Sequence, residues 1–186
     1  MLLFVGLGNP TQDSENNRHN VGFKIIDSIN KKFSLSKQKP KFKGLLTTGN
    51  IVDQKVYAIK PLTFMNNSGI CIREIIEYFK IDAADVIVFH DDLDVEFGKI
   101  KAKFGGSSAG HNGIASIDKF IGKDYSRVRI GIGKPKENLE VGDFVLQNFD
   151  EDEMLGVEKI SDNINESISI LINKKLDLFS STVNNK

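Results

Sequence analysis

Residues 85–92 read DVIVFHDD, and this short stretch decides the class of fold. The run over 85–89 is apolar after its first residue and lacks the alternation of a strand with one face in water. Such a strand is typical of a parallel sheet that is covered on both faces. His90, Asp91 and Asp92 follow at its carboxyl end, where open α/β sheets bind their ligands. The stretch therefore predicts a central strand and the place where chemistry is expected.

Strand and helix signals alternate on both sides of this stretch. The patterns predict strands at 1–7, 45–52, 55–59, 99–104 and 127–132. They predict helices at 21–33, from 66–68 to 79, from the end of the loop 105–110 to 120 or 121, and from 151 to about 173, with a short helix after it. Asn20 is expected to cap the first helix. The class is α/β, with a twisted, mixed but mostly parallel sheet flanked by helices.

Length and composition fit one domain. The 186 residues contain no Pro/Gly/Ser-rich linker, so we expect a single domain over 1–186, with the residues from about 180 open to disorder. The single cysteine, Cys71, lies in a predicted amphipathic helix and is expected to be a buried, inert thiol in a reducing, cytoplasmic setting. No apolar run approaches the ~18 residues that span a bilayer, so no membrane segment is expected.

Charge is unevenly distributed along the chain. The 25 basic and 25 acidic side chains balance, yet residues 1–81 hold 12 basic and 6 acidic ones, and residues 99–136 hold 9 and 2. The lysines within 31–43 have no acidic neighbour and alternate with Phe33 and Phe42. Two interpretations remain open, a solvated surface and a face that binds a polyanion.

Several common templates of binding and catalysis are incomplete. Gly6 and Gly8 begin a dinucleotide-binding pattern, but Thr11 stands at the third glycine position. There is no phosphate-binding P-loop, no nucleophile elbow and no zinc spacing, and Phe97 replaces the glycine of a calcium loop. We therefore expect neither a metal nor a cofactor.

The remaining polar set consists of histidines, carboxylates and side-chain amides at strand ends. A neutral histidine whose second nitrogen is fixed by a carboxylate can accept a proton from water. Asparagine side chains can hold a peptide-like substrate or an oxyanion. Asn9, Asn66 and Asn112 could bind substrate in this way, or they could simply cap helices and form turns. The sequence favours the two roles equally.

Six ordered motifs carry a resemblance to a known family. They are GLGNP with RHNVG (6–10 and 18–22), KPLTFMNNSG (60–69), HDDLD (90–94), GGSSAGHNG (105–113), RVRIGIGKP (127–135) and GDFVL (142–146). In order and spacing, from residue 1 to about 171, they resemble bacterial-type peptidyl-tRNA hydrolases.

The resemblance implies an enzyme that hydrolyses the ester between a peptide and the 3′ end of tRNA, and so recycles peptidyl-tRNA released by stalled ribosomes. It implies a monomer that needs no metal and no obligate protein partner. His19 would activate water, Asp91 would hold its imidazole, and Asn9 would distinguish a blocked amine from a free one. The residues implied to contact the peptide or the tRNA end are Phe64, Met65, Asn66 and Asn112, and those implied to face tRNA phosphates are Lys101, Lys103 and Arg129.

The chain departs from the family pattern between the two parts of the first motif. Ser14 stands where the family has a tyrosine, Thr11 where it has a glycine and Asn17 where it has a threonine. Ser14 therefore occupies a position implied to bind the tRNA end, but a serine cannot stack on a base. Phe64 is the alternative for that stacking.

Two other functions stay open at this point. The first is a catalytically silent RNA-binding relative, and the second is a nucleotide-binding module, against which the incomplete glycine pattern argues. Neither His90 nor His111 is expected to be essential for catalysis. The glycine-rich loop at 105–110 is expected to be mobile.

Overall fold

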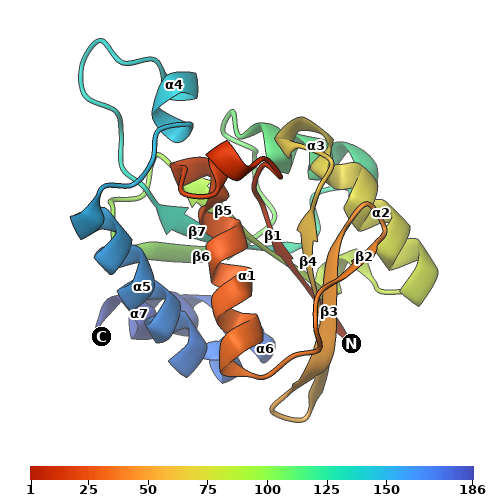
Figure 1. Ribbon diagram of the computed structural model, residues 1–186. Coiled ribbons are helices and arrows are strands. Elements are labelled where there is room, and N and C mark those ends of the chain that lie inside the picture. Colours follow the sequence, from red (N-terminus) through yellow and green to blue (C-terminus); the bar gives the residue numbers. More distant parts are fainter.

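The computed structural model describes all residues from 1 to 186 and contains one seven-stranded sheet, with strand order β2-β3-β4-β1-β5-β7-β6 (Figure 1). The strands are β1 (Leu2–Gly6), β2 (Lys39–Lys41), β3 (Gly44–Ile51), β4 (Gln54–Pro61), β5 (Val86–Asp92), β6 (Ile100–Phe104) and β7 (Ser126–Gly131). The four central strands β4, β1, β5 and β7 run parallel, and β2, β3 and β6 add antiparallel pairs at the edges. The predicted single α/β domain with a mixed sheet is confirmed.

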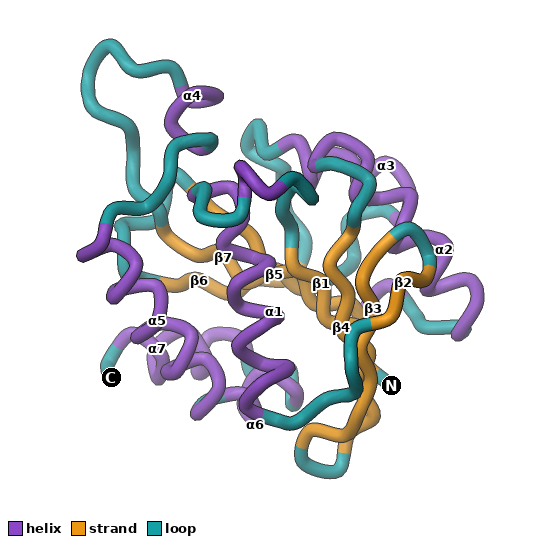
Figure 2. Tube along the Cα trace, in the orientation of Figure 1, coloured by secondary structure: helices purple, strands orange, loops and turns teal.

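Helices cover both faces of the sheet (Figure 2). The helices on one face are α1 (Val21–Lys32), α5 (Glu151–Glu166), α6 (Ile168–Ile172) and α7 (Leu176–Asn184), and those on the other are α2 (Ser68–Phe79) and α3 (Asn112–Ile121). The short α4 (Val141–Val145) stands on a loop above the carboxyl ends of the strands. Four 3-10 turns complete the structure: η1 (Gln12–Ser14), η2 (Arg18–Asn20), η3 (Met65–Asn67) and η4 (Ala83–Asp85). None of the helices has the length and apolar character needed to cross a membrane.

The sheet divides the core into two apolar layers. Along β5, Ile87 and Phe89 face the layer under α1 and α5, whereas Val86 and Val88 face the layer under α2 and α3. All four side chains are inaccessible to solvent. The continuous apolar run of this strand follows from cover on both faces, as the sequence predicted.

A glycine brings the start of α1 against the strand ends. A β-carbon at Gly22 would lie 2.4 Å from both the backbone nitrogen of Leu7 and the carbonyl oxygen of Phe89. Any side chain at this position would push α1 away from the sheet. The close contact therefore fixes η2, the turn just before α1, over the carboxyl ends of β1 and β5.

Three local features differ from the sequence predictions or add to them. The prediction of one continuous helix from 151 to about 173 is wrong. Ser167, at φ −104° and ψ 6°, divides this segment into α5 and α6. The lysine-rich segment 31–43, for which the sequence predicted no strand, contains the edge strand β2. Residues 176–184 form α7, which buries Phe179 and Val183, so the end that was open to disorder is helical here.

Helix α7 covers the outer edge of β6 with polar side chains. The backbone N–H of Ala102 donates to Ser180 Oγ at 2.8 Å. Asn184 accepts from the N–H of Ile100 and donates to its carbonyl, both at 2.8 Å. Backbone groups that no neighbouring strand pairs are thus satisfied by the helix.

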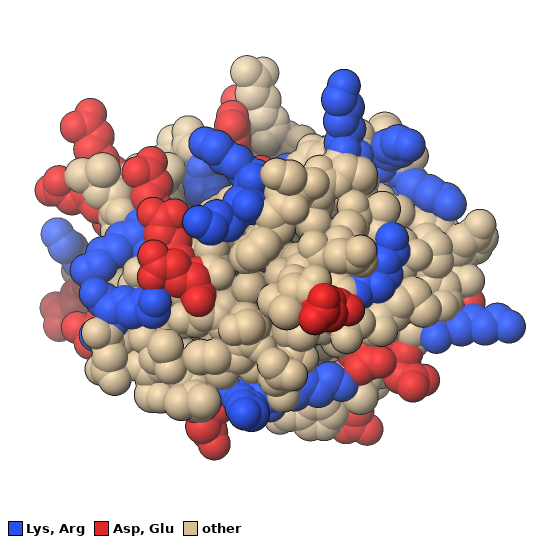
Figure 3. Space-filling view, turned by 90° about the horizontal axis from the view of Figure 1, so that it is seen from below, with Lys and Arg blue, Asp and Glu red and all other residues tan.

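Basic and acidic side chains are interspersed on the face opposite the strand ends. Figure 3 shows this face from below: lysine and arginine lie near aspartate and glutamate mainly toward its periphery, and much of the rest is uncharged. A surface of mixed sign has no strong attraction for a polyanion.

Candidate active site

A buried carboxylate joins two histidines above the carboxyl end of β5. His19 Nδ1, in η2, lies 2.9 Å from Asp91 Oδ2 and 3.0 Å from Oδ1. His111 Nε2, just before α3, lies 2.8 Å from Asp91 Oδ1. His19 comes from one helical layer and His111 from the other, so the two meet over the sheet at Asp91, which is 3% exposed.

The surroundings keep this carboxylate charged. Burial raises the pKa of Asp91, but the interactions with His111 and His19 outweigh it, so the pKa lies well below its ordinary range. An ionised carboxylate only accepts hydrogen bonds, so His19 Nδ1 must carry its proton toward Asp91. In the neutral ring, Nε2 is then free to accept a proton. This tautomer of His19 is the one that water activation requires.

His90 makes a different contact. Its Nδ1 donates to the backbone carbonyl of Asp91 at 2.8 Å, and its Nε2 is buried without a partner. Burial is the main cause that lowers the pKa of His90, to about 3, and the neighbouring His111 adds to it. His90 is therefore a neutral histidine that is held by the backbone of Asp91.

His111, which the sequence analysis expected not to be essential, contacts Asp91 directly, and the sequence did not predict this contact. Its Nδ1 accepts from the backbone N–H groups of Gly113 and Ile114, so it caps α3. Its other nitrogen reaches Asp91, and its ring centroid lies 4.9 Å from that of His19. The available signal was its place directly before a helix, beside Asn112 and at the sheet edge that carries Asp91.

Asn20 ties Asn9 in place instead of capping α1. Its Oδ1 accepts from the N–H of Asn9 at 2.8 Å, and its Nδ2 donates to the Asn9 carbonyl at 2.9 Å. The capping prediction is wrong for the side chain, which makes no bond to the helix. Asn9 Oδ1 in turn accepts from the N–H of Met65 at 2.9 Å, which leaves Asn9 Nδ2 as a donor without a protein partner.

The segment 60–69 meets the segment 105–113 through a sulfur contact. Met65 is buried, and a β-carbon at Gly113 would lie 2.4 Å from its sulfur. Phe64 precedes it with φ 62°, a conformation that bulky side chains rarely adopt and that costs on the order of 1–3 kcal/mol. Phe64 is 55% exposed and Asn66 is exposed as well, so both present their side chains to solvent.

A cavity of about 510 Å³ opens over the carboxylate and its two histidines. Asn112 and the loop 108–110 form one wall, and Val141, Gly142 and Val145 of α4 form the other. The structure does not bring Ser14 to this cavity. Ser14 is buried within η1, where its hydroxyl lies 2.7 Å from the Thr11 hydroxyl.

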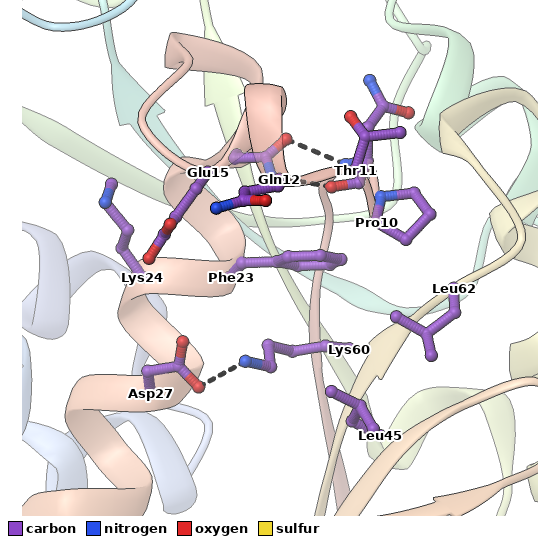
Figure 4. A pocket seen from close by; sticks show the side chains of 12 residues that line it. Pro10, Thr11, Gln12, Glu15, Phe23, Lys24, Asp27, Leu45, Lys60 and Leu62 are labelled. Carbon is purple, nitrogen blue, oxygen red and sulfur yellow. Dashed lines mark hydrogen bonds and ion pairs between the residues drawn. The ribbon is translucent and has the colours of Figure 1, made fainter.

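A smaller cavity of about 260 Å³ lies beside Asn9 and Asn20 (Figure 4). Phe23, Pro10 and Leu62 supply apolar contacts, and Lys60 crosses it to bond Asp27 at 2.6 Å. Asn9 and Asn20 line this smaller cavity, and neither lines the cavity over Asp91.

Arg18 fixes the backbone next to His19. Its guanidinium makes two bonds to Glu153 at 2.9 and 3.0 Å, and it donates to the carbonyls of Gln147 and Asn148. It also lies 4.4 Å from the centre of the Phe144 ring on α4. One buried side chain thus connects η2 with α4 and α5, a role that the sequence did not indicate.

The predicted basic residues share one side of the sheet. Lys101 lies opposite Arg129, and Lys103 lies opposite Arg127, in the antiparallel pair of β6 and β7. Burial and the charges of Arg129 and Arg127 lower the pKa of Lys103. Arg129 donates to Asp92 Oδ2 at 2.7 Å, and Asp92 is the last residue of β5. The guanidinium of Arg129 therefore lies at the carboxyl end of that strand.

The spacing of His19, Asp91 and His111 is one that a metal ion could use, since one ligand atom from each lies within 4.8 Å of the others. These atoms already bond one another, however, with Asp91 accepting from both rings. A metal would have to displace both hydrogen bonds. The arrangement fits the movement of protons better than it fits metal binding.

Comparisons with known proteins agree with this geometry. A family model described as peptidyl-tRNA hydrolase matches residues 3–186. A peptidyl-tRNA hydrolase of Pelagibacter ubique is 81% identical over 186 residues and all of both chains, and one of Bacillus subtilis is 44% identical over 87% of each. The crystal structure of peptidyl-tRNA hydrolase from Acinetobacter baumannii superposes with a TM-score of 0.91 at 32% identity, covering 99% of this chain and 94% of the other.

The family match spans nearly the whole chain, the relatives are similar over most of their length, and the solved structure has the same fold. The chain belongs to the peptidyl-tRNA hydrolase family.

Proposed function

We propose that His19 and Asp91 carry out the hydrolysis of peptidyl-tRNA that characterises the chain as a member of this family. The observation that supports this assignment is the bond of His19 Nδ1 to both oxygens of Asp91. It leaves Nε2 free at the edge of the cavity that His19 and Asp91 line.

The proposed reaction needs no covalent intermediate with the protein. His19 Nε2 takes a proton from water as the oxygen attacks the ester carbonyl carbon. The tetrahedral intermediate expels the 3′ oxygen of the tRNA, which receives the proton back from Nε2. The products are a peptide carboxylic acid, which releases its proton to solvent, and a tRNA with a free 3′ hydroxyl. Asp91 stabilises the imidazolium that exists between the two transfers.

Two side-chain amides at this end of the sheet, Asn112 in the cavity over Asp91 and Asn9 in the smaller cavity, are proposed to hold the peptide. Asn9 Nδ2 has no protein partner, so it can donate to a carbonyl of a blocked amino group. Asn112 lines the cavity, and Met65 backs it through its contact with Gly113. Phe64 and Asn66, which are exposed beside Met65, are proposed to contact the tRNA terminus or the peptide.

Lys101, Lys103 and Arg129 are proposed to contact tRNA phosphates. Their shared side of β6 and β7 and the link from Arg129 to Asp92 support this role. We further propose that the protein acts as a monomer in the cytoplasm, where ribosomes release peptidyl-tRNA, and that it uses no metal and no obligate protein partner.

Release of tRNA from an N-blocked aminoacyl-tRNA tests this function. The wild type should hydrolyse it, and His19→Ala should lose activity by a factor on the order of 10²–10⁴ while still binding tRNA. If His19→Ala keeps more than half of the wild-type rate, the assignment of the base is wrong. A wild type that binds the substrate without cleaving it would instead indicate the silent RNA-binding relative.

A further inference from the structure

Asp91 has a second partner that the proposed mechanism does not use. His111 Nε2 lies 2.8 Å from Asp91 Oδ1, and the His111 side chain is 9% exposed. The distance from His111 Nε2 to Asp91 is slightly shorter than the two distances from His19 Nδ1 to the Asp91 oxygens, which are 2.9 and 3.0 Å. The two histidines therefore share the negative charge of one buried carboxylate.

The start of α3 fixes the protonation of His111. The N–H groups of Gly113 and Ile114 point at Nδ1 from 3.1 and 3.3 Å, so this nitrogen offers its lone pair. A neutral ring then carries its only proton on Nε2, toward Asp91. A proton on Nδ1 would face these two N–H groups and the positive end of the helix dipole. The geometry makes His111 Nε2 a hydrogen-bond donor to Asp91.

We propose that His111 is a positioning residue that holds Asp91 and limits how strongly this carboxylate retains a proton on His19. The proposal rests on the proposed function of His19 as the base. A carboxylate bonded only to His19 would favour the imidazolium form, and a protonated His19 cannot accept a proton from water. By donating to Oδ1, His111 offsets part of that attraction and stops the carboxylate from turning.

The other charged groups around the site are paired elsewhere. On β5, His90 is buried and bonds the Asp91 carbonyl, while Asp92 bonds Arg129 of β7 at 2.7 Å. On the rim of the cavity, Asp94 lies 3.7 Å from Lys134. On η2, the Arg18 guanidinium is turned toward Glu153. The two histidines are thus the only groups that bond the Asp91 carboxylate directly.

Two substitutions of His111 separate its contacts. Asparagine is a good N-cap but is too short to reach Asp91, so His111→Asn keeps the cap and removes the donor. Glutamine can place an N–H₂ group near the position of Nε2, so His111→Gln keeps a donor to Asp91 and removes the cap. Thermal unfolding of both variants shows whether each remains folded, and kcat/KM on N-blocked aminoacyl-tRNA is then measured from pH 5 to 9.

We expect His111→Asn to lower kcat/KM about tenfold near neutral pH, the size expected for a lost bond to a charged group. We also expect the acidic limb of its pH profile to move up by about one unit. His111→Gln should keep the limb of the wild type. Unchanged activity and an unchanged limb in His111→Asn would overturn the proposal. A loss in His111→Gln as large as or larger than that in His111→Asn would overturn it as well, because His111→Gln keeps the donor to Asp91 and lacks only the cap.

Nitrogen NMR of the histidine rings in the wild type gives an independent test that does not depend on a variant folding. The neutral His111 ring should carry its proton on Nε2, with Nδ1 as an acceptor, and a signal from the Nδ1–H tautomer would contradict the proposal. In Asp91→Asn, the further change His111→Asn should have no additional effect on the pH profile. The His19→Ala variant separates this proposal from the proposed function. If His19→Ala is active, the proposed function is wrong, whatever the His111 variants do.

Discussion

At the scale of single residues, the role of Asp91 depends on its charge and not on its shape. Asp91→Asn preserves the size of the side chain but offers an N–H₂ group to His19, which favours the tautomer with the wrong nitrogen protonated. We expect kcat to fall by a factor on the order of 10²–10⁴, with a smaller change in KM. Steady-state kinetics on N-blocked aminoacyl-tRNA measures both constants.

Chelation provides the control for this prediction. The wild type should keep its activity after exhaustive treatment with EDTA, because in the proposed function His19 and Asp91 act through protons. Loss of activity that one particular metal restores would instead assign His19, Asp91 and His111 to a metal site, which their spacing allows.

The sequence indicated which residues meet at the candidate site better than it indicated the partners of each side chain. His19 and Asp91 stood out because their motifs follow two strands that end at one edge of the sheet. Asn20 was interpreted as a cap because its position at the helix start satisfies the local rule, while the bonds to Asn9 span 11 residues. A contact of this range depends on how η1 folds back, and no local pattern encodes it.

At the scale of secondary-structure elements, Arg18 connects η2 with α4 and α5. We expect Arg18→Met, which keeps the length of the side chain but removes the donors, to lower the free energy of unfolding by on the order of 3 kcal/mol, because Glu153 loses its partner in a largely buried site. We also expect kcat to fall more than KM changes, since the neighbouring His19 loses its fixed backbone. Chemical denaturation and kinetics check the two effects.

Lys186 and Glu166 supply a matched control, since this ion pair lies on the surface. Lys186→Met should change neither stability nor kcat appreciably, because water screens exposed pairs. If Arg18→Met behaves like Lys186→Met, then η2 does not need its tie to α5.

The limits of prediction at this scale are physical. The apolar positions of α5 and α6 follow one helical stripe through Ile164, Ile168 and Leu171, so the pattern cannot reveal the break at Ser167. Strand β2 is three exposed residues long and exists only through its pairing with β3. Neither feature has a local signal, because tertiary contacts create both.

At the scale of the whole molecule, we expect tRNA to bind along the edge of the sheet formed by β6 and β7, where basic side chains share one side. Replacing Lys101, Lys103 and Arg129 with glutamine should weaken tRNA binding and reduce the slope of log affinity against log salt by about one unit for each lost phosphate contact. Hydrolysis of a short ester substrate that lacks most of the tRNA should change little. Filter binding at several salt concentrations and kinetics on both substrates give the comparison.

Strand β2 offers a matched control at the opposite edge. Lys39 and Lys41 alternate on one side of β2 as Lys101 and Lys103 do on β6. If the variant with Lys39→Gln and Lys41→Gln loses as much salt dependence as the one with Lys101→Gln and Lys103→Gln, the lysine-rich segment 31–43 also contacts tRNA. Equal losses of the triple variant on long and short substrates would contradict a docking role.

The polar cover that α7 places on β6 has a consequence for solubility. Without Ser180 and Asn184, the N–H and carbonyl groups of Ile100 and Ala102 would face outward on an unprotected strand, which is a template for pairing with another chain. We expect Ser180→Ala with Asn184→Ala to self-associate through β6 at high concentration, as light scattering would detect, while Ser181→Ala, on the exposed side of α7, should not. The last helix of the chain thus serves as protection against aggregation, far from the chemistry and independent of it.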